Sequence, residues 1–194
     1  MHWARVLVER RLFVCVAGFP GAGKGVVVDV ARRLGLPVFV MGDVVREEVR
    51  RRGLEPTVEN LMKVANELRK VYGPNAIAVK TVEKVLATPH KLVVIDGVRS
   101  PYELEVFRQH GTVVVVWVEA SLKTRFERLS RRGRPGDPKT IEELKYRDSV
   151  EEKWGLGLVR VAADFTIVNE GGLEEARRLA ELVWRVLLYG VRES

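Results

Sequence analysis

A glycine-rich loop between an apolar strand and a helix is the feature that most constrains how this chain folds. Residues 12–17 (LFVCVA) are apolar throughout, as in a buried strand, and the loop after them ends in a lysine. The G-x-x-x-x-G-K spacing lets backbone N–H groups surround a phosphate, while the helix dipole and the lysine add positive charge. We therefore predict that the phosphates of a nucleoside triphosphate such as ATP bind to Gly18, Phe19, Pro20, Gly21, Ala22, Gly23, Lys24, Gly25 and Val26.

The alternative for this loop is an ordinary glycine-rich turn. The lysine and the strand–loop–helix context on both sides favour phosphate binding. Gly25 stands where Ser or Thr usually places a hydroxyl on Mg²⁺. Another residue must therefore hold the metal.

Short apolar runs recur along the chain and alternate with segments of helical periodicity. The runs cover residues 12–17, 38–41, 92–95, 113–118 and 165–168. This alternation predicts a three-layer α/β/α fold with a five-stranded parallel sheet, formed by residues 1–194 as one domain that contains the P-loop. Two inserts are expected, a helical acceptor-binding lobe at residues 43–88 and a short Gly/Pro-rich lid at residues 131–147.

Local patterns also predict where several helices begin and end. Small polar residues stand directly before helical segments and are expected to cap them; they are Thr57, Ser100, Ser121 and Thr140. Gly190 is expected to end the last helix.

Composition limits the class of protein. The chain has a net charge of +7, one cysteine (Cys15, in the first apolar run) and no stretch apolar enough to span a bilayer. We expect a cytoplasmic protein without disulfides or a membrane partner. Charged residues make up 30% of the chain and Gln occurs only at Gln109, which is typical of thermophile proteins. The positive charge favours binding of nucleotides or RNA. The sequence does not determine the oligomeric state.

Two polar segments that follow predicted strands suggest a metal site and an acceptor site. Asp96 comes directly after the third apolar run, where a carboxylate at the edge of a parallel sheet holds Mg²⁺ through its water shell. Gly97 permits close approach of a ligand, and Arg99 is placed to bind a phosphate of the acceptor. After the second run, Asp43 is placed to cap a helix, and Arg46 can bind an acceptor phosphate. The alternative for that segment is a capped helix with a solvated arginine.

Arginines recur in and around the predicted lid. Arg125, Arg128 and Arg132 share one helix face because they are three and four residues apart. Arg134 follows in the lid, and Arg147 lies in the next helix. A solvated basic face is the ordinary explanation, but the carboxylates of this part of the chain, Glu127 and Asp148, are too few to neutralise the set. We therefore expect these guanidinium groups to face a bound polyanion.

These motifs resemble those of the adenylate kinase group of nucleoside monophosphate kinases. GFPGAGKG (residues 18–25) is similar to the phosphate-binding loop of that group, Gly42-Asp43-x-x-Arg46 to its acceptor-phosphate motif, and DGVR (residues 96–99) to a shortened D-G-(F-P)-R segment. The segments MGDVVREE, IDGVRS, RFERL and IVNEG look closer to an archaeal family of adenylate-kinase-related, dephospho-CoA-kinase-like proteins whose substrate is largely unassigned. The resemblance covers most of the chain.

The resemblance implies roles for individual residues. It implies ATP and Mg²⁺ as cofactors, with Asp96 on the metal and Arg132 beside the loop on ATP. The catalytic cations are then Lys24, Arg128, Arg134 and Arg147, and the acceptor-binding residues are Asp43, Arg46, Gly97 and Arg99. Val26 replaces the usual Thr of adenylate kinases, so one contact to the α-phosphate is missing.

Two functions of different classes fit these features. The first is Mg²⁺-dependent transfer of the ATP γ-phosphoryl group to a small nucleotide-like acceptor, such as a nucleoside monophosphate or a dephospho-CoA-like molecule. The second is an ATP-dependent switch or ATPase in RNA or ribosome maturation, although the chain lacks an aromatic-rich basic strand face. A guanine-specific GTPase is disfavoured because residues 168–171 (VNEG) lack the Asn-Lys-x-Asp pattern. The sequence favours the kinase.

Overall fold

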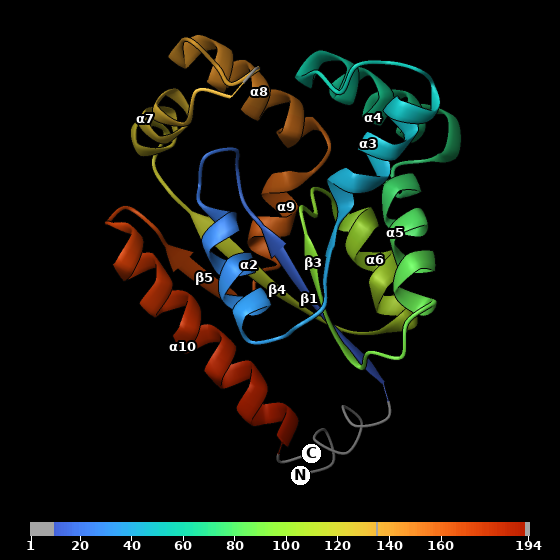
Figure 1. The fold of residues 1–194 in the computed structure, drawn as a ribbon, viewed down its shortest axis with the longest axis vertical. Coiled ribbons are helices and arrows are strands. Elements are labelled where there is room, and N and C mark those ends of the chain that lie inside the picture. The colour runs from blue at the N-terminus through green and yellow to red at the C-terminus, as the bar shows by residue number, and fades with distance from the viewer. Residues whose placement is uncertain (1–9, 135, 193–194) are drawn as a thin grey trace.

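A parallel sheet forms the centre of the molecule. The computed structural model describes residues 10–134 and 136–192. Within them, five parallel strands lie in the order β2-β3-β1-β4-β5 (Figure 1). The strands are β1 (Arg11–Ala17), β2 (Val38–Val40), β3 (Leu92–Asp96), β4 (Gly111–Glu119) and β5 (Phe165–Val168). The predicted fold class is confirmed.

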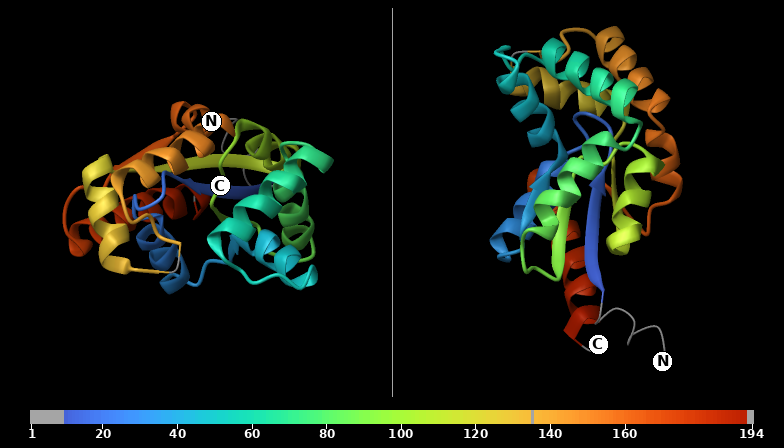
Figure 2. Two further views of the ribbon diagram at one scale, coloured as in Figure 1. Left: turned by 90° about the horizontal axis from the view of Figure 1, so that it is seen from above. Right: turned by 90° about the vertical axis from the view of Figure 1, so that its right-hand side faces the viewer.

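Helices cover both faces of this sheet. One face carries α2 (Lys24–Arg33) and α10 (Leu173–Arg192), and the other carries α5 (Ala76–Leu86), α6 (Pro101–His110) and α9 (Leu156–Val161) (Figure 2). Along β1, Phe13 and Cys15 belong to the core under α5 and α6, whereas Val14 and Val16 belong to the core under α2 and α10. Strand side chains point alternately to opposite faces, so each strand contributes to both apolar layers.

The remaining helices stand above the carboxyl ends of the strands. On one side lie α3 (Met41–Arg51) and α4 (Val58–Tyr72), and on the other α7 (Leu122–Arg132) and α8 (Ile141–Lys153) (Figures 1 and 2). Val45 of α3 and Leu68 of α4 are buried in the same core as Ile77 of α5. The carboxyl end of a parallel sheet is where ligands bind in open α/β folds, so these helices flank the expected site.

The predicted helix caps are confirmed. Side-chain oxygens of Thr57, Ser100, Ser121 and Thr140 accept hydrogen bonds from the backbone N–H groups of Asn60, Glu103, Thr124 and Glu143, respectively. Each bond satisfies a donor that a helix leaves unpaired at its start, which is worth about 1 kcal/mol. Local sequence therefore determines where α4, α6, α7 and α8 begin.

Two predictions of helix ends are wrong. Asp43 does not cap a helix, because α3 begins at Met41, directly after β2, and places Asp43 in its first turn. There the carboxylate of Asp43 accepts hydrogen bonds from Arg46 at 2.9 and 2.6 Å and remains favourable beside the positive end of the helix dipole. Gly190 does not end α10, which runs on to Arg192. A single glycine costs a helix interior only about 1 kcal/mol relative to alanine.

Candidate functional site

The glycine-rich loop turns tightly between the end of β1 and the start of α2. Gly18 (φ 149°) and Gly23 (φ 97°) adopt backbone conformations that residues with side chains rarely adopt. A Cβ atom on Gly18 would collide with the Val118 carbonyl oxygen, and one on Gly23 with the Asn169 side chain. No side chain in the described part of the chain caps α2, so its first N–H groups remain available to an anion.

Side chains from two other segments fix the shape of this loop. Arg125 of α7 donates to the Pro20 carbonyl oxygen at 3.2 Å, and its guanidinium carbon lies 5.1 Å from the centre of the Phe19 ring. Asn169, which follows β5, donates from Nδ2 to the Ala22 carbonyl oxygen at 2.8 Å. Anchoring these carbonyl groups holds the loop in one conformation, which is the preorganisation that phosphate binding requires.

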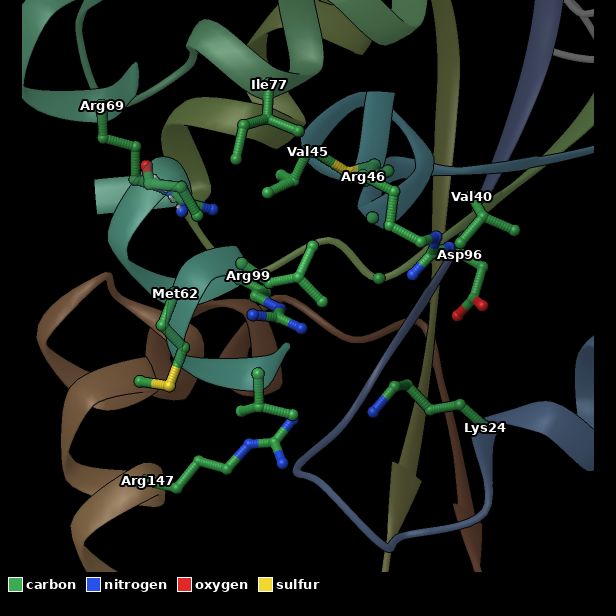
Figure 3. Close-up of a pocket in the computed structure, with 16 residues that line it drawn as sticks. Lys24, Val40, Val45, Arg46, Met62, Arg69, Ile77, Asp96, Arg99 and Arg147 are labelled. Atoms are coloured by element: carbon green, nitrogen blue, oxygen red, sulfur yellow. Dashed lines mark hydrogen bonds between the residues drawn. The ribbon is translucent and has the colours of Figure 1, made fainter. Parts of the chain in front are cut away.

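Lys24 and Asp96 lie close to each other beside the loop. In the sheet register Asp96 pairs with Val16 of β1 and with Val40 of β2, which puts it at the ligand-binding edge. The Nζ atom of Lys24 donates to the Gly18 carbonyl oxygen at 2.5 Å. Both side chains extend toward the same space in Figure 3. The structure therefore brings the predicted phosphate-binding cation and the predicted metal-binding carboxylate together.

Burial shifts the pKa of both groups. Desolvation lowers the pKa of Lys24 to about 8, and the negative charges of Glu151 and Asp96 oppose that shift. Desolvation raises the pKa of Asp96, and the positive charge of Lys24 opposes it. Each group thus favours the charged form of the other, and a bound phosphate would further favour protonated Lys24.

A cavity of about 240 Å³ opens beside these two residues and extends below α4 (Figure 3). Five of its sixteen lining residues are cationic, and one, Asp96, is acidic. The cations are Lys24, Arg46, Arg69, Arg99 and Arg147. A cavity with these cations is suited to a ligand that carries an anionic group.

The rest of the cavity wall is apolar. It consists of Val40, Met41, Val45, Val58, Leu61, Met62, Ala65 and Ile77, with Gly42 and Gly97 between them. None of the described lining residues has a neutral hydroxyl, amide or imidazole group. Such a wall suits a ligand with an apolar or flat body.

Two of the cavity arginines are closely paired. Arg46 binds Asp43 through Nε and Nη2. Arg69 donates from Nη2 to the buried carboxylate of Glu103 at 2.9 Å, and its guanidinium carbon lies 4.3 Å from the Trp154 ring centre. The Nε atom of Arg69 is buried and has no hydrogen-bond partner within the described ranges. These pairings fix the two guanidinium groups and reduce the charge that each presents to a ligand.

Arg99 and Arg147 are the least neutralised arginines among the described cavity residues. They share one carboxylate, since Oε1 of Glu151 lies 3.4 Å from Nη1 of Arg99 and 3.9 Å from Nε of Arg147. Both separations are longer than those of close charge-assisted hydrogen bonds. Burial lowers the pKa of Arg147, and the charge of Glu151 opposes that shift. An anion between the two arginines would be strongly favoured.

The arginines of α7 do not form a free cationic face. Arg125 is only 5% exposed and binds both carboxylate oxygens of Asp148, at 2.9 and 2.6 Å. Arg132 is paired with Asp137 in the lid segment. The expectation that too few carboxylates lie nearby is wrong for these residues. The fold packs α8 and the lid segment against α7, which sequence spacing did not indicate.

Arg128 and Arg134 are not among the residues that line the cavity. Arg128 donates to the carbonyl oxygens of Asn169 at 2.9 Å and Gly171 at 3.1 Å, after β5. The side chain of Arg134 is exposed, and its backbone N–H donates to Asp137 at 3.0 Å. The structure thus brings Lys24, Arg46, Asp96, Gly97, Arg99 and Arg147 around one cavity and leaves Arg128, Arg132 and Arg134 outside its lining.

The sequence analysis missed three charged residues of the site. The side chains of Arg69, Glu103 and Glu151 are 10%, 0% and 3% exposed, respectively. Arg69 lies four residues after Ala65 on the buried side of α4, and Glu151 lies four residues after Arg147 on α8. Residues four apart lie on the same face of a helix, so Arg69 could have been expected beside buried Ala65, and Glu151 beside Arg147.

The donor atoms fit a magnesium ion that is held mainly by phosphate and water. Asp96 supplies a carboxylate beside the loop. No group of three or more His, Cys, Asp or Glu side chains suited to a metal occurs among the described residues. Mg²⁺ commonly binds one or two carboxylates together with substrate phosphates and retains several waters. Asp96 is sufficient for that kind of site, whereas a metal cage built only from protein would need more ligands.

Comparison with known proteins agrees with this description. A family model described as "AAA domain" matches residues 17–145. A UPF0200 protein of Hyperthermus butylicus is 53% identical over 165 residues, which cover 85% of this chain and 89% of the relative. A UPF0200 protein of Staphylothermus marinus is 46% identical over 175 residues, which cover 90% and 92%. Such relatives are archaeal, as the resemblance implies, and thermophilic, as the composition predicts.

A solved structure shares the fold. The shikimate kinase from Acinetobacter baumannii in complex with shikimate has a TM-score of 0.58 and 18% identity, and the match covers 96% of this chain and 97% of that one. At this level of identity, the structural similarity shows a common architecture alone. No helix in the described ranges has the length and apolar character needed to cross a membrane.

Proposed function

We propose that this chain, which belongs to the AAA-domain family and to the UPF0200 proteins, is an ATP-dependent phosphotransferase that acts on a small nucleotide-like acceptor. One observation carries the proposal. A single cavity joins Lys24 and Asp96, beside the phosphate-binding loop, to Arg99, Arg147 and an apolar wall below α4. Direct phosphoryl transfer needs the acceptor to lie next to the ATP γ-phosphate, and this cavity is in that position.

The residues around the loop act on ATP in this proposal. The loop N–H groups and Lys24 bind the β- and γ-phosphates, and Asp96 holds Mg²⁺ through water. When bound, the metal neutralises charge on the β- and γ-phosphate oxygens. Arg99 and Arg147 stabilise the charge of the group in transfer. Positioning and charge account for nearly all catalysis of this type, so the protein need not supply a nucleophile.

The cavity wall supports a nucleotide-like acceptor. A nucleoside monophosphate or a dephospho-CoA-like molecule combines an anionic end with a flat heterocycle, which matches the cationic and apolar parts of the wall. In this proposal Arg46, Asp43 and Gly97 bind the acceptor, and residues 43–88 form the acceptor lobe.

Residues 131–147 act as the lid in this proposal. Arg147 already lines the cavity, whereas Arg134 is exposed and must move inward to reach a phosphate. Arg128 and Arg132 act on ATP in this proposal. Closure of such a segment would exclude water from the transferring group, which suppresses hydrolysis of ATP.

Acceptor-dependent formation of ADP tests the proposal. Purified protein is mixed with ATP, Mg²⁺ and one candidate at a time: each nucleoside monophosphate, dephospho-CoA, shikimate or RNA, with the Lys24→Met variant as a blank. We expect one nucleotide-like acceptor to raise ADP formation about tenfold or more above the acceptor-free rate. Stimulation by shikimate alone would contradict the acceptor class. Stimulation by RNA alone would favour an ATPase of RNA maturation over the kinase.

A further inference from the structure

A buried carboxylate lies among the cations of the cavity without being part of the predicted site. The side chain of Glu151 on α8 is 3% exposed. Its Oε1 atom lies 3.4 Å from Nη1 of Arg99 and 3.9 Å from Nε of Arg147. Among the charges that act on Lys24, Glu151 is the one that most strongly opposes the lowering of the Lys24 pKa by burial. One negative charge therefore acts on three cations that surround the proposed transfer point.

The two arginines reach this carboxylate from different parts of the fold. Arg99 lies between β3 and α6, and Arg147 lies on α8. Two guanidinium groups of like charge repel each other, and burial strengthens that repulsion. The backbone of Arg99 is fixed separately, because its N–H donates to Oε2 of Glu103 at 2.7 Å. Within the described residues Glu151 is the carboxylate that lies within 4 Å of both guanidinium groups, while the Trp154 ring centre lies 5.4 Å from the guanidinium carbon of Arg99.

The contacts of Glu151 are loose in comparison with a structural ion pair in the same protein. Arg125 and Asp148 form two hydrogen bonds, at 2.9 and 2.6 Å, which occupy donors of that arginine. At 3.4 and 3.9 Å, Glu151 attracts Arg99 and Arg147 but leaves their N–H groups able to bind another anion. This arrangement suits arginines that must remain close together and still bind a ligand.

We propose that Glu151 is a positioning residue for phosphoryl transfer, whose carboxylate keeps the guanidinium groups of Arg99 and Arg147 directed at the transferring phosphoryl group. The proposal rests on the proposed kinase function. Glu151 forms no covalent bond and moves no proton. Its role is to hold together two like charges that would otherwise separate.

This role predicts opposite effects on binding and on turnover. Glu151→Gln removes a negative charge next to an anion site, so an anion should bind as tightly as before or more tightly. Without that charge the two arginines are free to separate, and a displacement of about 1 Å can lower a rate roughly a hundredfold. A residue with a merely structural role would weaken binding and turnover together.

The experiment compares the wild type with Glu151→Gln, Glu151→Asp and the control Glu142→Gln, which removes an exposed carboxylate from the same helix. Calorimetry measures the dissociation constant of inorganic pyrophosphate, and acceptor-dependent ADP formation gives kcat and KM. For Glu151→Gln we expect an unchanged or lower pyrophosphate dissociation constant, an unraised KM for ATP and a kcat lower by about tenfold to a hundredfold. Glu151→Asp should recover most of the kcat, and Glu142→Gln should match the wild type.

Several results would overturn the proposal. They are a wild-type kcat in Glu151→Gln, a weaker pyrophosphate affinity in that variant, or an equal loss of kcat in Glu151→Asp and Glu151→Gln. If Glu151→Gln does not fold, Glu151→Asp alone tests the proposal. Because this variant retains the carboxylate charge, its pyrophosphate dissociation constant and its kcat should both stay near the wild-type values. If the wild type transfers phosphate to no acceptor, the proposed function fails, and Glu151 is then judged on pyrophosphate binding alone.

Discussion

Replacing Arg125 by methionine should strongly destabilise the protein, although its spacing from Arg128 and Arg132 predicts a helix face that binds a polyanion. Methionine retains an unbranched apolar side chain and removes the charge. In the structure Arg125 is 5% exposed and binds Asp148 at 2.9 and 2.6 Å. It also donates to the carbonyl oxygens of Pro20 and Ala120, each at 3.2 Å. The substitution therefore breaks contacts among α7, α8 and the phosphate-binding loop.

The size of the loss follows from what remains buried. The side chain of Asp148 is 16% exposed, so removal of Arg125 leaves a largely desolvated carboxylate without its partner. Breaking a buried ion pair from one side costs about 3–5 kcal/mol. We expect Arg125→Met to lower the free energy of unfolding by that amount. Asp148→Asn keeps one hydrogen-bonding oxygen and should cost less, about 1.5–3 kcal/mol.

Guanidinium-induced unfolding followed by circular dichroism measures these losses. The matched control is Arg131→Met, since Arg131 lies on the same helix and is exposed; its effect should stay within about 0.5 kcal/mol. The double variant should lose clearly less than the sum of the single losses, because the two residues contact each other. A loss for Arg125→Met below about 1 kcal/mol, or equal to that of Arg131→Met, would refute this reading of the buried pair.

Three further perturbations probe other parts of the structure. Lys24→Met should abolish phosphoryl transfer, because the Lys24 ammonium group binds the phosphates of ATP in this proposal. The circular dichroism spectrum should stay unchanged, because that group is not needed for folding; retained turnover would contradict the assigned role. Arg46→Ala should raise the acceptor KM by about tenfold or more in steady-state assays and change the ATP KM much less, since a charged hydrogen bond is worth about 1.5–3 kcal/mol; equal effects would count against an acceptor role. Hydrogen bonds from Arg51 and Arg52 lower the pKa of Glu48 from 4.5 to about 2. Ionised Glu48 therefore contributes fully to the free energy of unfolding above pH 4.5, and this contribution is lost as the pH falls through 2. Glu48→Gln should therefore unfold at a lower denaturant midpoint than wild type at neutral pH and at a similar one near pH 2; a difference independent of pH would exclude this linkage.

The sheet and the strand–loop–helix arrangement around Gly18–Lys24 could be predicted because their signals are local. An apolar run followed by G-x-x-x-x-G-K specifies strand, loop and helix within one short segment. The position of Asp96 follows from the same logic, since parallel strands end at the same edge and Asp96 ends β3. Cap residues such as Ser100 were equally local, because each bonds to a backbone group three residues away.

The charge pairing could not be predicted because it depends on contacts between distant segments. Arg125 is 23 residues from Asp148, and Arg69 is 34 residues from Glu103. Counting carboxylates near each arginine in the sequence therefore overestimated the free positive charge of the lid. The wrong cap at Asp43 has a related cause. Met41 is buried and α3 starts directly at the end of β2, so tertiary packing determines that helix start rather than a local cap.

Transfer of the γ-phosphoryl group from ATP to a small acceptor is the central claim. Its most direct test uses ATP with radioactive phosphorus in the γ-position, Mg²⁺ and the acceptor that stimulates ADP formation, with products separated by chromatography. We predict that the label appears in the phosphorylated acceptor in an amount equal to the ADP formed, and that Arg147→Met greatly reduces this product. Label found only in inorganic phosphate, with every acceptor and with or without RNA, would contradict the claim.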